Sequence, residues 1–387
     1  MPDVRLTWRS NDQKEKLDSR KQIKDFPNDV LRNTNLLFYS DNLDVMDHLI
    51  NTGFSRKIDL IYIDPPFYSN ENYFLRRKNT QSIGFSDIWK GRISEYLEMI
   101  YPRLCAMHRL LSKSGSIFVH LDWHVVHYVK VIMDEIFKPE NFRNEIIIKR
   151  GRRKNLLYQF KSLDRMHNSN DSILWYSKSP ETRYPPPLVE YASASKWMGF
   201  WSNVDRPTLR YEIFGIVPER GQWKWSKARA SKAIRNYHVY QRKHRFLSLD
   251  EYWSQTGRTL EFIRKRKGVK YPEYWIPAKS HKILDNIWTD IETYDYSTGY
   301  GTEKHVELLQ RIIGKFSRPD NTVADFFCGS GTSLLVASRM NRHWIGCDSS
   351  SLAMKVSRKR LRGYNYRFLI SKAKPSRQGL KQAVSIS

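Results

Sequence analysis

The sequence predicts an α/β protein whose doubly wound, mostly parallel sheet is interrupted by an inserted basic domain. Three observations support this fold class. Short apolar runs alternate with segments of helical period towards both ends of the chain, a pattern typical of parallel strands that helices cover on both faces. Between about 179 and 285 the alternation stops, and clusters of Lys and Arg lie among tryptophans. The length of 387 residues accommodates one large domain and one smaller one.

The first part of the predicted sheet lies within 34–178. Continuous runs of aliphatic, β-branched and aromatic residues predict buried strands, at 35–40, 58–63, 116–122, 144–149 and 171–176. Apolar residues at helical spacing predict helices between the strands, at 43–50, 97–111 and 126–137. The alternation of the two kinds of segment favours a parallel sheet.

The second part of the predicted sheet lies within 286–372, where the alternation returns. Helices are predicted at 306–313 and 334–340, and strands at 323–328 and 343–348. The remaining segments are interpreted as a polar N-terminal arm, the inserted domain and a basic, mobile tail, at 1–33, 179–285 and 373–387.

The charge of the chain predicts a polyanionic partner. The formal net charge is +26, and Lys and Arg that neutralise phosphates release condensed counterions. No apolar run approaches the roughly 20 residues of a membrane-spanning helix. The first residues lack the apolar core of a secretory signal. We therefore expect a soluble protein with a nucleic acid as its partner and no membrane partner.

The three cysteines are Cys105, Cys328 and Cys347, and they show neither Cys-x-x-Cys nor Cys/His spacing. This pattern predicts reduced, buried side chains and neither a disulfide framework nor a metal site. None of the cysteines follows a proline, as the nucleophile of enzymes that methylate carbon 5 of cytosine does. That chemistry is disfavoured.

A glycine-rich turn, DFFCGSGT at 325–332, leads from a predicted strand into a predicted helix. Glycines in such a turn let the backbone approach a ligand at the helix N-terminus. A second strand ends in Asp348 about 20 residues later, the spacing at which a carboxylate reaches ribose hydroxyls. Together these features predict a nucleoside cofactor. The full Gly-x-Gly-x-x-Gly pattern is absent, which disfavours NAD.

The second motif is Asp64-Pro65-Pro66-Phe67, directly after the apolar run at 58–63. A carboxylate at the carboxyl end of a parallel strand points into the crevice where such sheets bind ligands. The prolines lack N–H donors and favour extended backbone, so their carbonyls stay available as acceptors. Asp64 and the Pro65 carbonyl could both accept hydrogen bonds from one NH₂ group, while Phe67 supplies a ring for stacking. The alternative is that the prolines only end the strand and Asp64 caps it.

These motifs and their order resemble the β-class DNA amino-methyltransferases, a circularly permuted group in which the catalytic half precedes the cofactor half. The resemblance covers about 34–178 and 286–370, and it implies a Rossmann-like methyltransferase sheet with S-adenosylmethionine as the cofactor. The family's catalytic motif matches Asp64, Pro65, Pro66 and Phe67. The residues that match its cofactor motifs, its strand-end acids and its Thr-Gln-Lys-Pro segment are Asp41, Thr302, Lys304, Asp325, Phe327, Cys328, Gly329, Ser330, Gly331, Thr332 and Asp348.

Two positions depart from the family pattern, since Phe326 and His305 each stand where a proline is usual. Both positions shape the backbone, so the changes bring loop geometry into doubt more than activity. His120 and Asp122 lie at the end of the predicted strand at 116–122, and His124 follows it. These side chains could line the pocket, but a structural role is favoured for them.

The resemblance implies methyl transfer to the N6 amino group of an adenine that is flipped out of double-stranded DNA. It also implies that the inserted domain recognises the target. N4 of cytosine is the nearest alternative, although family members with that target more often carry serine in place of Asp64. RNA, a protein glutamine amide and a DNA-binding module with a decayed active site are further alternatives. A homodimer and a cognate restriction endonuclease are left open as partners. We expect a prokaryotic, cytoplasmic protein that associates with the nucleoid.

Overall fold

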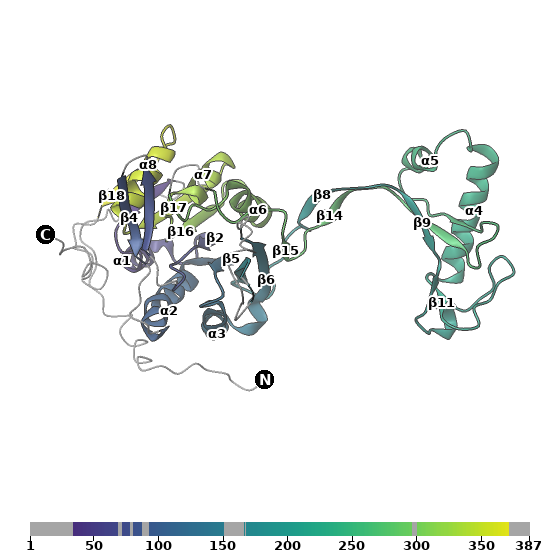
Figure 1. Cartoon of the computed structure of the whole chain (residues 1–387), viewed down its shortest axis with the longest axis horizontal. Helices are drawn as coiled ribbons and strands as arrows, with labels where there is room; N and C mark the ends of the chain where they lie inside the picture. Colours follow the sequence, from purple (N-terminus) through teal and green to yellow (C-terminus); the bar gives the residue numbers. More distant parts are fainter. Residues whose placement is uncertain are drawn as a thin grey trace, which may run out of the picture. The chain divides into compact units, whose positions relative to one another are not determined.

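The computed structural model describes residues 34–68, 72–77, 80–86, 93–150, 166, 168–295 and 300–370, with the backbone alone described between 72 and 86. The predicted arm at 1–33 and the predicted tail at 373–387 lie outside these residues. The chain divides into two compact units (Figure 1). Unit 1 comprises Met1–Pro185 and Asp285–Ser387, and unit 2 comprises Pro186–Leu284.

Unit 1 contains a large sheet, in which the described residues form nine strands. In spatial order these are β15 (Ile287–Trp288), β6 (Phe142–Lys149), β7 (Asn170–Ser177), β5 (Leu111–Leu121), β2 (Ile58–Ile63), β16 (Thr322–Asp325), β17 (His343–Asp348), β1 (Leu36–Tyr39) and β18 (Arg367–Ile370). Strand β7 is antiparallel to both of its neighbours, and every other pair of neighbours is parallel.

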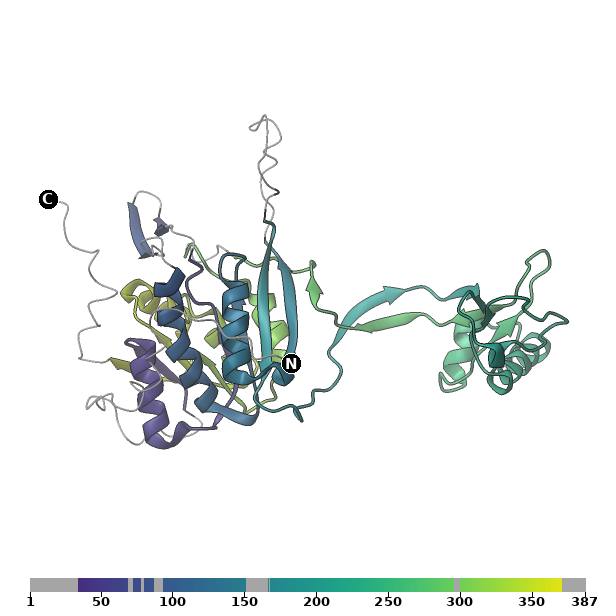
Figure 2. The same ribbon diagram turned by 90° about the horizontal axis from the view of Figure 1, so that it is seen from below.

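Helices cover both faces of this sheet (Figures 1 and 2). One face packs against α1 (Asn42–Leu49), α2 (Ile93–Leu110) and α3 (Val126–Phe137), and the other packs against α6 (Val306–Phe316), α7 (Thr332–Arg339) and α8 (Ser351–Arg360). Strand residues alternate between the two faces, as the pleat requires. Ile61 and Ile63 join the core beneath the first group of helices, whereas Gly346 lies directly under Leu334 of α7. The predicted doubly wound, mostly parallel α/β sheet is confirmed.

The order of the strands reveals the circular permutation. β1, the first described strand, pairs in parallel with β17, and Tyr39 lies opposite Asp348. The chain reaches β2 only after crossing beneath β17 and β16. Consequently β2, β16, β17 and β1 lie side by side and point the same way, so their carboxyl ends meet at one edge.

Several elements of unit 1 were not predicted. They are the π-helical turn η2 (Ile50–Phe54), the hairpin of β3 (Asn72–Arg77) and β4 (Thr80–Ser86), the 3-10 turn η3 (Pro139–Asn141), and β15, α8 and β18. Helix α8 is mostly polar and buries few side chains, among them Ala353 and Met354, so it lacks a clear apolar period.

Unit 2 has a core of its own, built largely from aromatic rings. A three-stranded antiparallel sheet, two strand pairs, two helices and one 3-10 turn surround it. They are β12 (Ile263–Arg264), β13 (Glu273–Ile276) and β9 (Lys196–Gly199); β10 (Trp201–Ser202) with β11 (Gln222–Trp223); β8 (Leu188–Ser193) with β14 (Lys279–Ile283); α4 (Lys227–Lys243), α5 (Leu249–Gln255) and η4 (Pro207–Leu209). Trp223 and Trp275 are buried in this core. The first and last strands of the unit pair with each other, and Leu284 N donates to the Pro187 carbonyl at 2.7 Å.

Candidate active site

Four acids lie at the shared carboxyl edge of the sheet in unit 1. Asp64 follows β2, Asp325 ends β16, Asp348 ends β17 and Asp41 follows β1 by two residues. These strands are consecutive neighbours and parallel, so the acids lie in the order 64, 325, 348 and 41 along one edge. In open α/β sheets this edge is where ligands bind. The structure therefore brings the two motifs together although more than half of the chain separates them.

The loop after β2 holds Asp64 and Phe67 against the rest of unit 1. The Asp64 side chain is 17% exposed, so it remains reachable from solvent. Phe67 is buried, and its ring centre lies 5.8 Å from that of His120 on the neighbouring strand β5. The ring of Phe67 is thus fixed in place close to Asp64.

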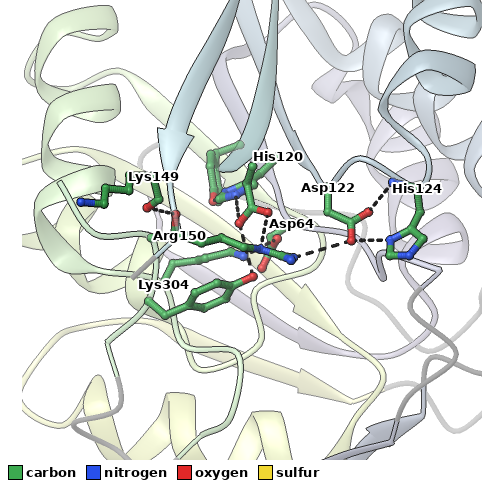
Figure 3. A network of polar contacts seen from close by, with 11 residues as sticks. Asp64, His120, Asp122, His124, Lys149, Arg150 and Lys304 are labelled. Atoms are coloured by element: carbon green, nitrogen blue, oxygen red, sulfur yellow. Dashed lines mark hydrogen bonds and ion pairs between the residues drawn. The ribbon is translucent and has the colours of Figure 1, made fainter. Parts of the chain in front are cut away.

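Lys304 is the cation of this site (Figure 3). Its ammonium nitrogen lies 2.9 Å from Asp64 Oδ1 and forms an ion pair with it. The same nitrogen lies 4.6 Å from the centre of the Phe67 ring and 4.4 Å from that of Tyr294, within the range of cation–π attraction. Lys304 was predicted to bind the cofactor, and in the structure its ammonium group contacts Asp64 and the rings of Phe67 and Tyr294.

A buried polar network that includes His120 and Arg150 (Figure 3) contacts Phe67 through the ring of His120. His120 Nδ1 lies 2.9 Å from the hydroxyl oxygen of Tyr62, and His120 Nε2 lies 3.5 Å from Asp171 Oδ2. Burial lowers the pKa of His120, and the nearby charge of Lys304 lowers it further. A neutral imidazole therefore lies next to Phe67 at neutral pH.

Asp171 links this histidine to Arg150, which directly follows the adjoining strand β6. Arg150 Nε lies 2.7 Å from Asp171 Oδ1, and the Tyr294 hydroxyl donates to Asp171 Oδ2 at 3.4 Å. Burial opposes the ionisation of Asp171, but His120, Lys304 and Arg150 outweigh it, and the pKa of Asp171 is lowered. The network therefore contains a charged carboxylate that is compensated by Arg150 and Lys304.

Asp122 and His124 shape the loop after β5. The backbone N–H of His124 donates to Asp122 Oδ1 at 3.0 Å, and His124 Nδ1 lies 2.6 Å from Asp122 Oδ2. Arg150 reaches Asp122 as well, at 3.6 Å (Figure 3). Burial raises the pKa of Asp122 against the opposing contacts of His124 and Arg150.

The glycine turn packs closely on α8 and on the end of β17. Gly329 N donates to Asp348 Oδ2 at 2.9 Å, and the Ser357 hydroxyl donates to the Gly329 carbonyl at 2.7 Å. Gly331 has φ +76° at the start of α7, and a Cβ there would lie 2.8 Å from Ser357 Oγ. Only glycine meets both the backbone and the packing requirement at 331.

Asp325 lies beneath this turn. Its carboxylate accepts hydrogen bonds from Phe327 N and from the Ser333 hydroxyl, and the residue is 3% exposed. Burial raises the pKa of Asp325 to about 7, although both hydrogen bonds oppose the shift. Through these two hydrogen bonds Asp325 holds the shape of the turn.

The segment that precedes α6 touches both motifs. Glu303 forms an ion pair with Arg360 of α8, and Arg360 also donates to the Ser330 carbonyl at 3.2 Å and to Thr332 Oγ1 at 2.8 Å. The next residue, Lys304, pairs with Asp64. Two consecutive residues thus connect the glycine turn to the Asp-Pro-Pro-Phe loop.

The carboxylate of Asp41 accepts hydrogen bonds from two other residues of unit 1. Arg103 of α2 reaches both of its oxygens, at 3.1 and 3.0 Å, and Asp41 Oδ1 accepts from Leu43 N at the start of α1.

Cys328 and Cys347 are buried, and burial raises the pKa of both thiols.

The sequence did not identify the residues that support the site. These residues are Tyr62, Arg103, His120, Arg150, Asp171, Tyr294 and Arg360. They come from separate strands and helices, and no local pattern joins them. The interpretation of His120, Asp122 and His124 as structural agrees with their contacts, although His120 also lies against Phe67. Within the described residues, no group of three or more His, Cys, Asp and Glu side chains could hold a metal ion, and no helix is long and apolar enough to cross a membrane.

Comparison with known proteins gives a consistent set of relatives. Residues 58–359 match the family model N6_N4_Mtase, described as DNA methylase. The type II methyltransferase M.EcaI of Enterobacter cloacae is 31% identical over 340 residues, which cover 84% of this chain and 69% of the relative. M.KpnI of Klebsiella pneumoniae is 25% identical over 341 residues, covering 79% and 76%. The type III StyLTI Mod subunit of Salmonella typhimurium is 26% identical over 395 residues, covering 90% of this chain but only 57% of that subunit.

Among solved structures, a DNA modification methylase of Thermus thermophilus complexed with S-adenosyl-L-methionine has a TM-score of 0.45 and 13% identity, covering 87% of this chain and 99% of that one. The family model matches most of the chain, including both motifs, and the sheet has the permuted strand order. This chain belongs to the DNA methylase family N6_N4_Mtase.

Proposed function

We propose that this chain transfers a methyl group from S-adenosylmethionine to the N6 amino group of an adenine flipped out of double-stranded DNA. The observation that carries the proposal is the position of Asp64 and the glycine turn at neighbouring strand ends, connected through Glu303 and Lys304. A carboxylate acceptor and a nucleoside-binding turn at one edge are the parts that methyl transfer to an amino group requires.

The residues at the edge fit the nucleoside part of the methyl donor. The turn contains two glycines with positive φ, Gly329 and Gly331, at the N-terminus of α7. Asp348 at the end of β17 is only partly buried. Its carboxylate accepts the backbone N–H groups of Gly329, Ser349 and Ser350, and since a carboxylate has about four lone-pair sites, one remains for a ribose hydroxyl. When bound, the cofactor supplies an electrophilic methyl group on a sulfonium centre.

The residues of the Asp-Pro-Pro-Phe loop bind the flipped adenine in this proposal. Extrusion of the base costs a few kcal/mol, and Phe67 offers a ring on which it can stack. Asp64 and the Pro65 carbonyl accept hydrogen bonds from the two amino hydrogens, which directs the nitrogen lone pair towards the methyl group. Methyl transfer would break the C–S bond of the donor as the N–C bond forms, and one amino proton would then pass to Asp64 or to water. Alignment of the two reactants supplies much of the rate.

Unit 2 is proposed as the part that recognises the target. Its 99 residues, Pro186–Leu284, contain 20 Lys and Arg and 8 Asp and Glu, a balance suited to the DNA backbone. The relatives named above are type II and type III modification enzymes. On that basis we assign the chain the modification role in a restriction–modification system.

The test is expression in a methylation-deficient host, followed by single-molecule sequencing of the host DNA. N6-methyladenine at one recurring site supports the proposal, and Asp64→Ala should remove it while cofactor binding, measured by calorimetry, is retained. N4-methylcytosine at the site would replace adenine as the target. DNA with no modified base, from a host that produces folded protein, would favour the DNA-binding module with a decayed site.

A further inference from the structure

Helix α4 of unit 2 has two contrasting faces. The face towards the unit's own sheet is apolar, with Ala230, Ala233 and Tyr240 buried. Tyr237 on this face also contacts the ring of Trp197, at 5.2 Å between centres. The helix is therefore held firmly on β9, β12 and β13, and its opposite face is directed away from the unit's core.

The opposite face carries exposed cations at helical spacing. Lys232, Arg235 and Arg242 are exposed and follow one another at intervals of three and seven residues, which places them on one side of the helix. Lys243 is exposed next to them. None of these four side chains takes part in an ion pair with another described residue of the chain.

The surrounding sequence supplies no negative charge to balance these cations. From Arg220 to Leu249 there is no Asp or Glu, while nine Lys and Arg are present. The first turn of α4 contains Lys227 and Arg229 where acids would be favoured by the helix dipole. Arg229 pairs with Glu261, whereas the other five Lys and Arg of α4 form no ion pair with a described residue. Five such cations on one helix of 17 residues suit an anionic partner.

One exposed apolar residue interrupts this basic face. Val239 is 43% exposed and lies four residues after Arg235 and three before Arg242, so it belongs to the same side of the helix. A surface that only bound phosphates would gain nothing from an exposed valine. In the major groove, apolar side chains contact the thymine methyl group while arginines bind guanine edges.

We infer that α4 is the helix that enters the major groove of the target DNA, with Arg235, Val239 and Arg242 facing base edges and Lys232 and Lys243 facing phosphates. This inference rests on the proposed function of unit 2 in target recognition. The helix has 17 residues, about 25 Å in length at 1.5 Å per residue, and the major groove, about 12 Å wide, admits a helix of this kind.

The first test measures DNA binding without methylation. Fluorescence anisotropy on an arbitrary B-form duplex, at about 50 to 200 mM salt, gives the slope of log K against log salt. Replacing Lys232 and Lys243 with Gln should reduce the slope by about 0.9 for each phosphate that is no longer neutralised. The matched control is Arg206→Gln with Lys267→Gln, which removes two exposed cations of unit 2 that lie outside α4. An unchanged slope in the α4 variant, or an equal reduction in the control, overturns the inference.

The second test measures selectivity, once the methylated site has been mapped. Arg235→Gln with Arg242→Gln should reduce the preference for the mapped site over a scrambled duplex at least about thirtyfold, because each of the two base contacts contributes about 1–3 kcal/mol. The control pair should leave the preference unchanged. A preference retained by the α4 variant contradicts the inference, even if wild type methylates DNA. If wild type does not methylate but the first test gives the expected slopes, the proposed reaction fails and the inference stands. Tighter binding to an RNA duplex than to DNA also overturns it, since the deep, narrow A-form major groove excludes a helix.

Discussion

The ammonium nitrogen of Lys304 lies 2.9 Å from Asp64 Oδ1, and the two side chains are 6% and 17% exposed. The pair lies where water screens charge poorly, and Lys304 comes from a segment about 240 residues further along the chain. Each partner therefore needs the other. A cation at this position also fixes the orientation of the carboxylate on which the proposed reaction depends.

Lys304→Met should lower both stability and turnover. Loss of one partner from a shielded ion pair leaves the other charge uncompensated, and we expect a loss of about 2 kcal/mol, below the 3–5 kcal/mol of fully buried pairs. Turnover should fall at least tenfold at saturating cofactor, because Asp64 then lacks the cation that holds it. Thermal unfolding and single-turnover methyl transfer measure the two effects. Lys315→Met, an exposed lysine of α6, is the control, and equal behaviour of the two variants would contradict the role of Lys304.

Gly331→Ala should destabilise the protein more than Gly363→Ala. Both glycines have positive φ, +76° and +89°, so both variants incur about 1–2 kcal/mol of backbone strain. A Cβ at 331 would in addition lie 2.8 Å from Ser357 Oγ, whereas a Cβ at 363 would meet nothing within 4 Å. Chemical denaturation should resolve a difference of about 1–3 kcal/mol from overpacking, together with weaker cofactor binding for Gly331→Ala alone. Equal losses would show that the contact with Ser357 does not shape the turn.

Arg360→Met should separate cofactor binding from stability when it is combined with Glu303→Gln. The single variant leaves Glu303, which is 1% exposed, without its cation, and should cost about 3–5 kcal/mol. The double variant removes both charges and should recover most of that stability. Both variants lack the hydrogen bonds to Ser330 and Thr332, so calorimetry should show about tenfold weaker cofactor binding in each.

Arg358→Met, which removes an exposed cation of the same helix, serves as the reference for these two variants. Cofactor affinity that recovers along with stability in the double variant would mean that Arg360 acts on folding alone.

The pH dependence of stability should reveal Asp325. Its pKa is raised from 3.8 to about 7, so the folded state binds more protons than the unfolded state between these values. The stabilising contribution is complete below the unfolded pKa and is lost as the pH rises through about 7. Asp325→Asn removes this loss, so the melting temperature of the variant relative to wild type should increase from pH 5 to pH 8. The corresponding change in the free energy of unfolding should be a few kcal/mol, because each tenfold change in proton affinity contributes about 1.4 kcal/mol.

The control for this measurement is Asp320→Asn, an exposed carboxylate with positive φ that asparagine tolerates. Its difference from wild type should not change across the same pH range. A flat difference for Asp325→Asn would mean that the carboxyl ionises as freely in the folded protein as in the unfolded chain.

Much of the fold and the two motifs could be predicted because their patterns are local. An apolar run that ends in an acid, as in 58–64 or 343–348, indicates both a buried parallel strand and the position of its carboxyl end. The circular permutation could be predicted because the Asp-Pro-Pro-Phe motif precedes the glycine-rich turn in the sequence. These features need no knowledge of which residues meet across the sheet.

The support of the site could not be predicted, because it depends on strand register. Strand β7 pairs antiparallel with both β5 and β6, and this places Asp171 opposite Ile148 and within reach of His120 and Arg150. A shift of one residue would turn Asp171 to the other face of the sheet. The secondary structure of unit 2 could not be predicted either. Its strands β10, β11 and β12 have two residues each, and its core is formed by aromatic side chains that follow no sequence period.

The hydrogen bond between Leu284 N and the Pro187 carbonyl has a consequence for the history of the chain. Because the unit that contains these residues begins and ends at one point, an exchange of the whole segment between genes would not require the host sheet to change its ends. If unit 2 recognises the target, as proposed above, replacement of this unit alone would change the target sequence and leave unit 1 unchanged.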